Sequence, residues 1–309
     1  MKILLTSTSF MDTPGAHHDL LESIGAEIDT LRGPLKEEEL LPIIGDYDAI
    51  VCGDDEYTRQ VLEKGRAGKL RYLSKYGIGL DKIDLKAAKD LGIPVASTPG
   101  VNHVTVAEHT FTHILAFFKN YYEEVGYVKE GKWKRLIQHE IYGKRLSIFG
   151  LGRIGKELSI RAKAFGLEVK VYDPYADKDF VAKNDLTLCD NLDDLFNDAE
   201  IISLHSPLNE ETKHVLNAER FAKLNYCPLV VNTARAGLVD KEAVMAALDK
   251  KQICGYVADV MWDEPVIPDD PILKYPNVFI TPHISSRTYE SVVRQGSAAV
   301  NNLIELLKK

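Results

Sequence analysis

The stretch Gly150-Leu151-Gly152-Arg153-Ile154-Gly155 decides the fold of this chain, because of what precedes and follows it. The apolar run Arg145–Phe149 before it predicts a short strand. Apolar residues after it recur at helical spacing until Gly166, a residue type that commonly ends a helix. The spacing G-x-G-x-x-G alone is weak, and it also occurs where glycines serve packing only. Between a strand and a helix it predicts a dinucleotide-binding turn.

Each position of this turn has a physical role. Gly150 permits the tight turn, Gly152 lets backbone N–H groups approach a pyrophosphate, and Gly155 lets the helix pack close to the sheet. A helix that begins near Arg153 and Ile154 offers unpaired amides to the phosphates. These five residues are therefore predicted to contact the cofactor.

An acidic residue ends the next predicted strand, Leu167–Tyr172. Asp173 follows the last glycine of the turn by eighteen residues (173 − 155), close to the spacing of a carboxylate that binds a ribose. The residues at 174–177 include no arginine that could bind a 2′-phosphate. The sequence therefore predicts NAD, not NADP, as the cofactor.

Length and composition indicate a soluble protein of two domains. The chain has 309 residues, of which 45% are hydrophobic and 27% are charged. A net charge of −8 argues against nucleic acid or an anionic membrane as a partner. The N-terminus resembles a first strand and not a signal peptide, and the four cysteines lack metal-ligand spacing. We expect reduced, buried thiols, no metal site, and a cytoplasmic location.

Strands and helices alternate along the whole chain, which is typical of parallel sheets covered on both faces. One series of expected strands comprises Lys2–Ser7, Ala49–Cys52, Arg71–Tyr76 and Val95–Ser97, with helices around Ala16–Ile24, Thr58–Lys64 and Leu85–Leu91. A second series comprises Arg145–Phe149, Leu167–Tyr172, Ile201–His205, Leu229–Asn232, Gly255–Val260 and Val278–Ile280. The fold class is therefore α/β, with two doubly wound parallel-sheet domains.

Two long helical patterns, about Val101–Tyr122 and Tyr289–Leu307, frame the second series. If the last helix returns to the first series, the first domain is discontinuous. We therefore expect a substrate or catalytic domain of flavodoxin-like fold at 1–99 plus 284–309. A Rossmann NAD-binding domain is expected at 100–283, inserted in the first.

Three side chains that suit hydride chemistry follow three separate predicted strands. Arg235, Glu264 and His283 come after Leu229–Asn232, Gly255–Val260 and Val278–Ile280, respectively. Taken singly, each is also typical of an exposed turn. Together they suit reduction of a 2-keto acid, because a histidine can protonate the developing alkoxide and a carboxylate can fix its tautomer. An arginine can bind the substrate carboxylate through two hydrogen bonds.

Further motifs extend this pattern over nearly the whole chain: Lys75-Tyr76-Gly77-Ile78-Gly79-Leu80-Asp81, Val104–His109 and Leu204–Leu208. With them the sequence resembles the D-2-hydroxyacid dehydrogenase family, in the branch similar to D-3-phosphoglycerate dehydrogenase. We expect a short form without a regulatory domain, since the chain ends at Lys309. The resemblance implies a homodimer, with a small 2-hydroxy or 2-keto acid as substrate.

The resemblance also implies roles for individual residues. Arg235, Glu264 and His283 are the implied catalytic residues. Substrate binding is implied for Tyr76, Gly77, Ile78 and Gly79, together with Arg235. Cofactor contacts beyond the glycine turn and Asp173 are implied at Val106, His205, Pro207, Thr233, Ala234, Asp259, Ser285 and Ser286. Asp259 is the implied partner of the carboxamide, while the two serines either contact the cofactor or cap the last helix.

Two departures from the family pattern limit the assignment of a substrate. Phosphoglycerate-type enzymes usually carry an arginine where this chain has Gly53-Asp54-Asp55-Glu56, and an acidic loop is expected to repel a phosphate. Compensation by Lys75, Lys132, Lys134 and Arg135 is the alternative. Ser285-Ser286 stands where the family often has two glycines.

The sequence thus predicts an NAD-dependent oxidoreductase that interconverts a small D-2-hydroxy acid and its 2-keto acid. The alternatives are D-3-phosphoglycerate dehydrogenase itself and a non-enzymatic NAD(H)-sensing protein of the corepressor type. Formate dehydrogenase is disfavoured, because that enzyme carries glutamine where this chain has Glu264.

Overall fold

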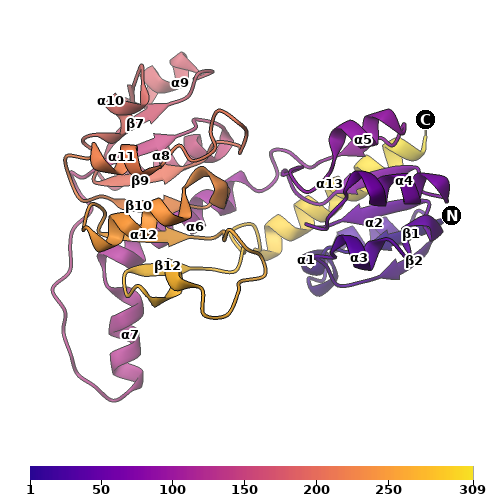
Figure 1. The fold of residues 1–309 in the computed structure, drawn as a ribbon, viewed down its shortest axis with the longest axis horizontal. Helices are drawn as coiled ribbons and strands as arrows, with labels where there is room; N and C mark the ends of the chain where they lie inside the picture. Colours follow the sequence, from indigo (N-terminus) through magenta and orange to yellow (C-terminus); the bar gives the residue numbers. More distant parts are fainter. Residues whose placement is uncertain (309) are drawn as a thin grey trace. The chain divides into compact units, whose positions relative to one another are not determined.

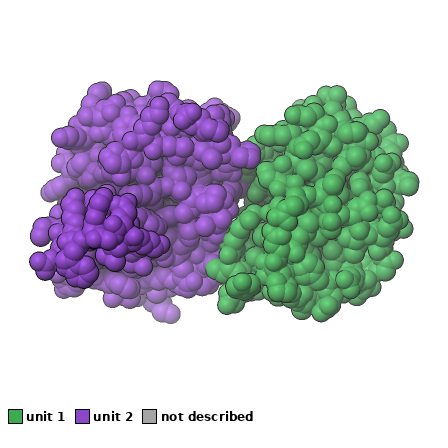
Figure 2. All heavy atoms as spheres, turned by 90° about the horizontal axis from the view of Figure 1, so that it is seen from below, with its two compact units in different colours: residues 1–102, 286–309 green, residues 103–285 purple. Residues whose placement is uncertain are grey.

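The computed structural model describes residues 1–308 and contains two compact units. Unit 1 comprises residues 1–102 and 286–309, and unit 2 comprises residues 103–285 (Figure 2). Each unit has its own parallel sheet, five-stranded in unit 1 and seven-stranded in unit 2, so the predicted fold class is confirmed. The functional domains proposed from the sequence, 1–99 with 284–309 and 100–283, stay a prediction.

Unit 1 has the strand order β2-β1-β3-β4-β5, which is the flavodoxin-like order. Figure 1 labels its strands β1 and β2 and its helices α1 to α5 and α13. Its strands are β1 (Lys2–Leu5), β2 (Glu27–Thr30), β3 (Ala49–Cys52), β4 (Tyr72–Lys75) and β5 (Val95–Ala96). Its helices are α1 (Thr8–Asp12), α2 (Ala16–Glu22), α3 (Glu37–Leu40), α4 (Arg59–Ala67), α5 (Leu85–Asp90) and α13 (Tyr289–Leu307), with a 3-10 turn at Ile44–Asp46. Alternate residues of β1 enter separate cores, since Leu4 packs with Ile50 while Ile3 packs with α13 residues such as Val300.

Unit 2 has the strand order β12-β11-β10-β9-β6-β7-β8, which reverses direction between β6 and β9. Its strands are β6 (Arg145–Phe149), β7 (Glu168–Tyr172), β8 (Thr187–Leu188), β9 (Ile201–Leu204), β10 (Leu229–Asn232), β11 (Gly255–Ala258) and β12 (Val278–Ile280). Its helices are α6 (His103–Phe118), α7 (Tyr121–Lys129), α8 (Arg153–Ala164), α9 (Lys178–Lys183), α10 (Leu192–Phe196), α11 (Ala218–Ala222) and α12 (Lys241–Asp249), with 3-10 turns at Ala236–Leu238 and Pro271–Lys274. Ligands bind at such a reversal, outside the carboxyl ends of the strands.

One expectation about local structure is wrong, and two strands were missed. The single helix expected over Val101–Tyr122 is two helices, because α6 ends at Phe118 and Asn120 has a left-handed φ of +46° before α7 begins. Asparagine tolerates that conformation better than most residues. Strands β2 and β8 were not predicted, and β2 shows why: its sequence Glu-Ile-Asp-Thr lacks an apolar run.

Two further properties concern the chain as a whole. Cys52 and Cys189 are buried and Cys254 is half-buried, but Cys227 is exposed, contrary to the expectation of four buried thiols. Within residues 1–308, every helix falls short of the length and apolar character needed to cross a membrane.

Candidate functional site

The glycine turn lies where the strand order of unit 2 reverses. Gly150 has φ +98°, and a Cβ there would lie 2.8 Å from the backbone of His205 and Ser206, in the loop after β9. A Cβ at Gly155 would lie 2.2 Å from the carbonyl oxygen of Gly150. Both positions therefore require glycine, and the turn after β6 packs directly against the loop after β9.

The N-terminus of α8 is open beside this turn. Gly152 is the N-cap, no side chain caps the helix there, and a Cβ at Gly152 would meet no atom within 4 Å. In the described part of the chain, the N–H groups of Arg153, Ile154 and Gly155 donate no hydrogen bond. Unpaired amides and the helix dipole favour an anion at this position.

Asp173 connects the turn to the end of β7. Its Oδ2 accepts a hydrogen bond from the N–H of Leu151 at 2.8 Å, and its Oδ1 accepts one from the N–H of Tyr175 at 2.8 Å. An ionised carboxylate offers about four acceptor positions, so two remain for hydroxyl groups. An open helix N-terminus and a neighbouring carboxylate together fit the pyrophosphate and ribose of NAD.

The loop after β9 contributes a half-buried histidine whose Nδ1 is fully enclosed. The His205 Nε2 lies 2.8 Å from the Ser203 hydroxyl, and burial lowers the pKa of His205 to about 3. Its Nδ1 has no hydrogen-bond partner among residues 1–308. Pro207 is exposed, and its carbonyl accepts a hydrogen bond from Thr212 at 2.6 Å. His205 is therefore neutral at physiological pH.

The predicted trio follows three neighbouring strands. Since β10, β11 and β12 are adjacent and parallel, Arg235, Glu264 and His283 lie at one edge of the sheet. The Nδ1 of His283 lies 2.9 Å from the Oε2 of Glu264, and Oε1 of Glu264 accepts a hydrogen bond from the Met261 N–H at 2.9 Å. The histidine and glutamate side chains are 34% and 36% exposed, so they pair while remaining accessible.

His283 has an unusual backbone conformation. Its φ is +52°, in the left-handed region that non-glycine residues rarely adopt. Such conformations cost of order 1–3 kcal/mol and cluster at functional sites. The structure therefore holds this imidazole against Glu264 at a cost in backbone energy.

Hydrogen bonds from Asn232 shape the loop that carries Arg235. The Nδ2 of Asn232 donates to the Arg235 carbonyl at 2.9 Å, and its Oδ1 accepts from the Ala234 N–H at 3.1 Å. The hydroxyls of Thr233 and Thr110 lie 2.8 Å apart, which ties the loop to α6. Arg235 also donates through Nη1 to the Ala234 carbonyl at 2.8 Å. Thr233 and Ala234, predicted as cofactor contacts, thus also define the loop.

Asp259 anchors the segment that carries His283. Its carboxylate is fully buried and accepts hydrogen bonds from the Thr281 hydroxyl (2.5 Å) and from the N–H groups of Ile284 (2.8 Å) and Ser285 (2.7 Å). These bonds span both sides of His283 and hold its loop in place. The contact of Asp259 with a nicotinamide carboxamide stays a prediction.

Two histidines of α6 complete this cluster and were not selected from the sequence. The Nε2 atoms of His109 and His113 lie 3.1 and 3.3 Å from the Thr281 hydroxyl. Burial lowers the pKa of both imidazoles, and that of His113 falls to about 4. Their four-residue spacing on a helical pattern was the available signal. Val106, a predicted cofactor contact, is buried one turn earlier on α6.

Because His113 is buried, we expect it to make the stability of the fold depend on pH. Because its pKa is about 4 in the folded state against 6.5 unperturbed, its contribution is complete above pH 6.5 and is lost as the pH falls toward 4. As the pH falls from 6.5 to 4, the free energy of unfolding should therefore decrease in both proteins. The decrease should be smaller in His113→Gln than in the wild type by about 3 kcal/mol. Denaturant unfolding at several pH values measures this, with exposed His139→Gln as the control. Equal pH dependence of His113→Gln and the wild type would contradict the assignment.

The two serines after His283 do not cap the last helix. The N-cap of α13 is Thr288, whose side chain accepts a hydrogen bond from the Ser291 N–H at 3.2 Å. Ser285 is buried, and its N–H donates a hydrogen bond to Asp259. The carbonyl of Ser286 accepts a hydrogen bond from Gln295 at 3.3 Å. The capping alternative is therefore wrong, and a cofactor contact by either hydroxyl stays a prediction.

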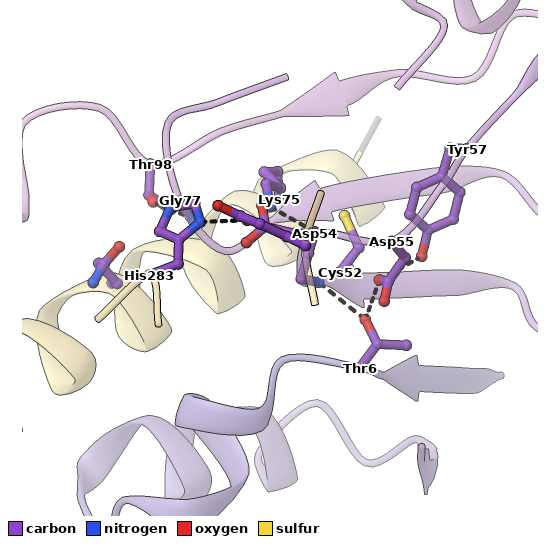
Figure 3. A network of polar contacts seen from close by, with 12 residues as sticks. Thr6, Cys52, Asp54, Asp55, Tyr57, Lys75, Gly77, Thr98 and His283 are labelled. Carbon is purple, nitrogen blue, oxygen red and sulfur yellow. Dashed lines mark hydrogen bonds and ion pairs between the residues drawn. The ribbon is translucent and has the colours of Figure 1, made fainter. Parts of the chain in front are cut away.

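The predicted substrate loop follows β4 in unit 1 (Figure 3). Gly77 has φ +123°, its N–H donates to the Thr98 hydroxyl at 3.0 Å, and its carbonyl accepts from the Thr98 N–H at 2.9 Å. Tyr76 is buried, and Ile78 is 42% exposed. Within residues 1–308, the N–H groups of Ile78 and Gly79 donate no hydrogen bond. Two amides of this loop are therefore available to an anion.

The acidic side chains of the loop after β3 are paired or buried, while repulsion of a phosphate by this loop stays a prediction. Asp54 pairs with Lys75 at 2.6 Å, and Glu56 pairs with Lys36 at 2.9 Å. Asp55 is fully buried; it accepts hydrogen bonds from the Thr6 hydroxyl and the Leu35 N–H, and burial raises its pKa. Each acid has a partner, which the sequence pattern did not reveal.

Other charged groups lie apart from these contacts. Lys132, Lys134 and Arg135 are exposed, with Lys132 paired to Glu130 at 2.7 Å and Lys134 bonded to the Tyr127 hydroxyl at 3.1 Å. Over the described residues, His, Cys, Asp and Glu side chains form no group of three or more able to hold a metal ion.

Comparison with known proteins supplies further information. Residues 111–285 match the family described as D-isomer specific 2-hydroxyacid dehydrogenase, NAD binding domain. The chain is 36% identical over 302 residues to D-3-phosphoglycerate dehydrogenase of Methanocaldococcus jannaschii, covering 96% of this chain but only 57% of that protein. It is 36% identical to hydroxypyruvate reductase of Thermotoga maritima, covering 91% and 92%, respectively. The TT0316 protein of Thermus thermophilus superposes with a TM-score of 0.87 at 31% identity, covering 100% of this chain and 97% of that one.

Proposed function

Because the chain belongs to the D-isomer specific 2-hydroxyacid dehydrogenase family, we propose that it interconverts a small D-2-hydroxy acid and its 2-keto acid with NAD. The observation that carries this proposal is the contact of His283 with Glu264 at the carboxyl ends of adjacent strands. The same edge of the sheet bears the glycine turn and Asp173. Unit 2 would bind the cofactor and unit 1 the substrate.

In unit 2, His283 would transfer the proton and Glu264 would position its ring. When bound, NADH would supply the hydride to the substrate carbon during reduction, and NAD⁺ would accept it during oxidation. A protonated His283 donates through Nδ1–H to Glu264, which leaves Nε2–H to protonate the carbonyl oxygen during reduction. In the reverse direction the same nitrogen accepts the hydroxyl proton. Glu264, held by the Met261 N–H, is the positioning residue that fixes the ring.

Two groups would bind the substrate carboxylate. The guanidinium of Arg235 offers paired donors that match a carboxylate and also polarise the adjacent carbonyl. In unit 1, the unpaired N–H groups of Ile78 and Gly79 offer backbone donors of the same kind. Both sets favour a 2-keto acid over a neutral ketone or aldehyde.

The test is oxidation of NADH, followed by absorbance, with glyoxylate, hydroxypyruvate, phosphohydroxypyruvate and larger 2-keto acids. NADPH is run in parallel, because Asp173 should repel a 2′-phosphate. Turnover with NADH and at least one 2-keto acid supports the proposal. No turnover with any of them would contradict it.

D-3-phosphoglycerate dehydrogenase activity is a second candidate. The relative from Methanocaldococcus jannaschii carries that name, although this chain spans only 57% of its length. Preference for phosphohydroxypyruvate over hydroxypyruvate in the same assay would favour this candidate.

We also propose a homodimer that uses the segment after α6. Val128, Trp133 and Ile137 are 56%, 83% and 90% exposed, which is unusual for apolar side chains so close in sequence. Burial against a second copy would remove this apolar surface from water. Sedimentation velocity should find twice the mass of one chain, and a monomer at micromolar concentration would contradict the proposal.

A further inference from the structure

A buried cation ends β4, directly before the proposed substrate loop. The side chain of Lys75 is 3% exposed, and its Nζ donates to the Gly53 carbonyl at 2.5 Å and to the Asp54 Oδ1 at 2.6 Å (Figure 3). An ammonium group has three N–H donors. In the described chain, these two contacts are the hydrogen bonds of Lys75, so one donor remains.

The remaining donor lies close to the loop. A Cβ added at Gly77 would be 3.8 Å from Cε and 4.0 Å from Nζ of Lys75. The unpaired N–H groups of Ile78 and Gly79 follow within two residues. The start of the loop that carries these amides therefore lies beside the ammonium group.

Asp54 sets the net charge at this position. Its side chain is 55% exposed, and its carboxylate pairs with Lys75, which leaves the pair neutral overall. The neighbouring acids have other partners. Asp55 accepts hydrogen bonds from Thr6 and Leu35, and Glu56 forms an ion pair with Lys36. Within this loop, Asp54 is thus the acid that offsets the buried cation.

We propose that Lys75 binds the anionic group of the substrate through its third N–H, and that Asp54 makes the site selective for substrates with a single negative charge. The inference rests on the proposed function and names its substrate class: small 2-keto acids without a phosphate. A neutral Lys75–Asp54 pair can donate a hydrogen bond to one carboxylate. It provides no net positive charge for a second anionic group.

The first test replaces Asp54 with asparagine, which keeps the shape and leaves Lys75 with a net positive charge. The measurement is the ratio of kcat/KM for phosphohydroxypyruvate to kcat/KM for hydroxypyruvate. The ratio should rise about tenfold in Asp54→Asn, because each added negative charge on the substrate is then attracted. Both substrates are compared on one variant, so any general loss of turnover cancels in the ratio.

The matched control is Glu56→Gln, which removes one negative charge from the same loop without touching the Lys75 pair. Its ratio should stay within twofold of the wild type. A second variant, Lys75→Met, should raise KM for hydroxypyruvate about tenfold while the affinity for NADH, measured by fluorescence titration, stays unchanged.

Three results would overturn the inference. These are an unchanged ratio in Asp54→Asn, an equal rise in Glu56→Gln, and an unchanged KM in folded Lys75→Met. In each case a wild-type enzyme that reduces 2-keto acids leaves the proposed function standing. A wild type that reduces none of them overturns the proposed function, and the inference with it.

Discussion

Replacing His283 with asparagine should lower kcat for 2-keto acid reduction by about 10²–10⁴-fold, the usual effect of removing a general acid. This corresponds to about 3–5 kcal/mol of barrier. Asparagine is the best replacement because it tolerates the left-handed φ of +52° at this position. The affinity for NADH, measured by fluorescence titration, should stay unchanged.

The chain offers a closely matched control in His214. This histidine also has φ +52°, and its Nδ1 lies 3.5 Å from the Asp240 carboxylate in the same unit. His214→Asn therefore makes the same chemical change in the same backbone conformation at a residue outside the trio. It keeps the N–H group that donates to the Gly237 carbonyl, and it should leave kcat within twofold. Equal losses in the two variants would assign the effect at His283 to folding and contradict its role as the acid.

Replacing Arg235 with alanine should lower kcat/KM by about 10²–10³-fold, since truncating one partner of a hydrogen-bonded charge pair costs about 2–5 kcal/mol. Arg235→Lys should recover only part of this loss, because lysine keeps the charge but lacks the planar pair of donors. Steady-state kinetics with a 2-keto acid measures both variants.

Arg161→Ala is the control for general effects of removing an arginine. Arg161 lies on α8, where it pairs with Glu157 at 2.6 Å and Glu108 at 3.2 Å. Its replacement should leave kcat/KM for the keto acid nearly unchanged. If Arg235→Ala behaved in the same way, the substrate carboxylate would have to be bound without Arg235.

The sheets were predictable wherever a strand is buried on both faces. The runs at β3, β6 and β10 are short and apolar, and their predicted ranges agree with the structure. Edge strand β2 was missed because its residues are half-exposed and polar. The break between α6 and α7 depends on the single left-handed residue Asn120, which does not interrupt the apolar pattern.

The pairing of His283 with Glu264 could be expected, because both residues follow strands of one parallel sheet. The hydrogen bonds that Asp259 makes to the segment around His283 could not be predicted. Asp259 reaches Thr281, Ile284 and Ser285 across 22 to 26 residues, and such contacts depend on the conformation of the intervening loop.

The partners of the acidic residues in unit 1 could not be predicted from the sequence. The run Asp54-Asp55-Glu56 shows three negative charges, whereas the structure pairs Asp54 with Lys75 and Glu56 with Lys36 and buries Asp55. The partners come from other elements, so a local charge count cannot reveal them.

The most direct test of the account follows the hydride itself. The enzyme is incubated with hydroxypyruvate or glyoxylate and NADH that carries deuterium at the reactive C4 position, and the product is analysed by mass spectrometry. We expect one deuterium bound to C2 of a 2-hydroxy acid, with D configuration where C2 is a stereocentre, and loss of this product in His283→Asn. Tight binding of NADH with no deuterium in any 2-hydroxy acid would contradict it.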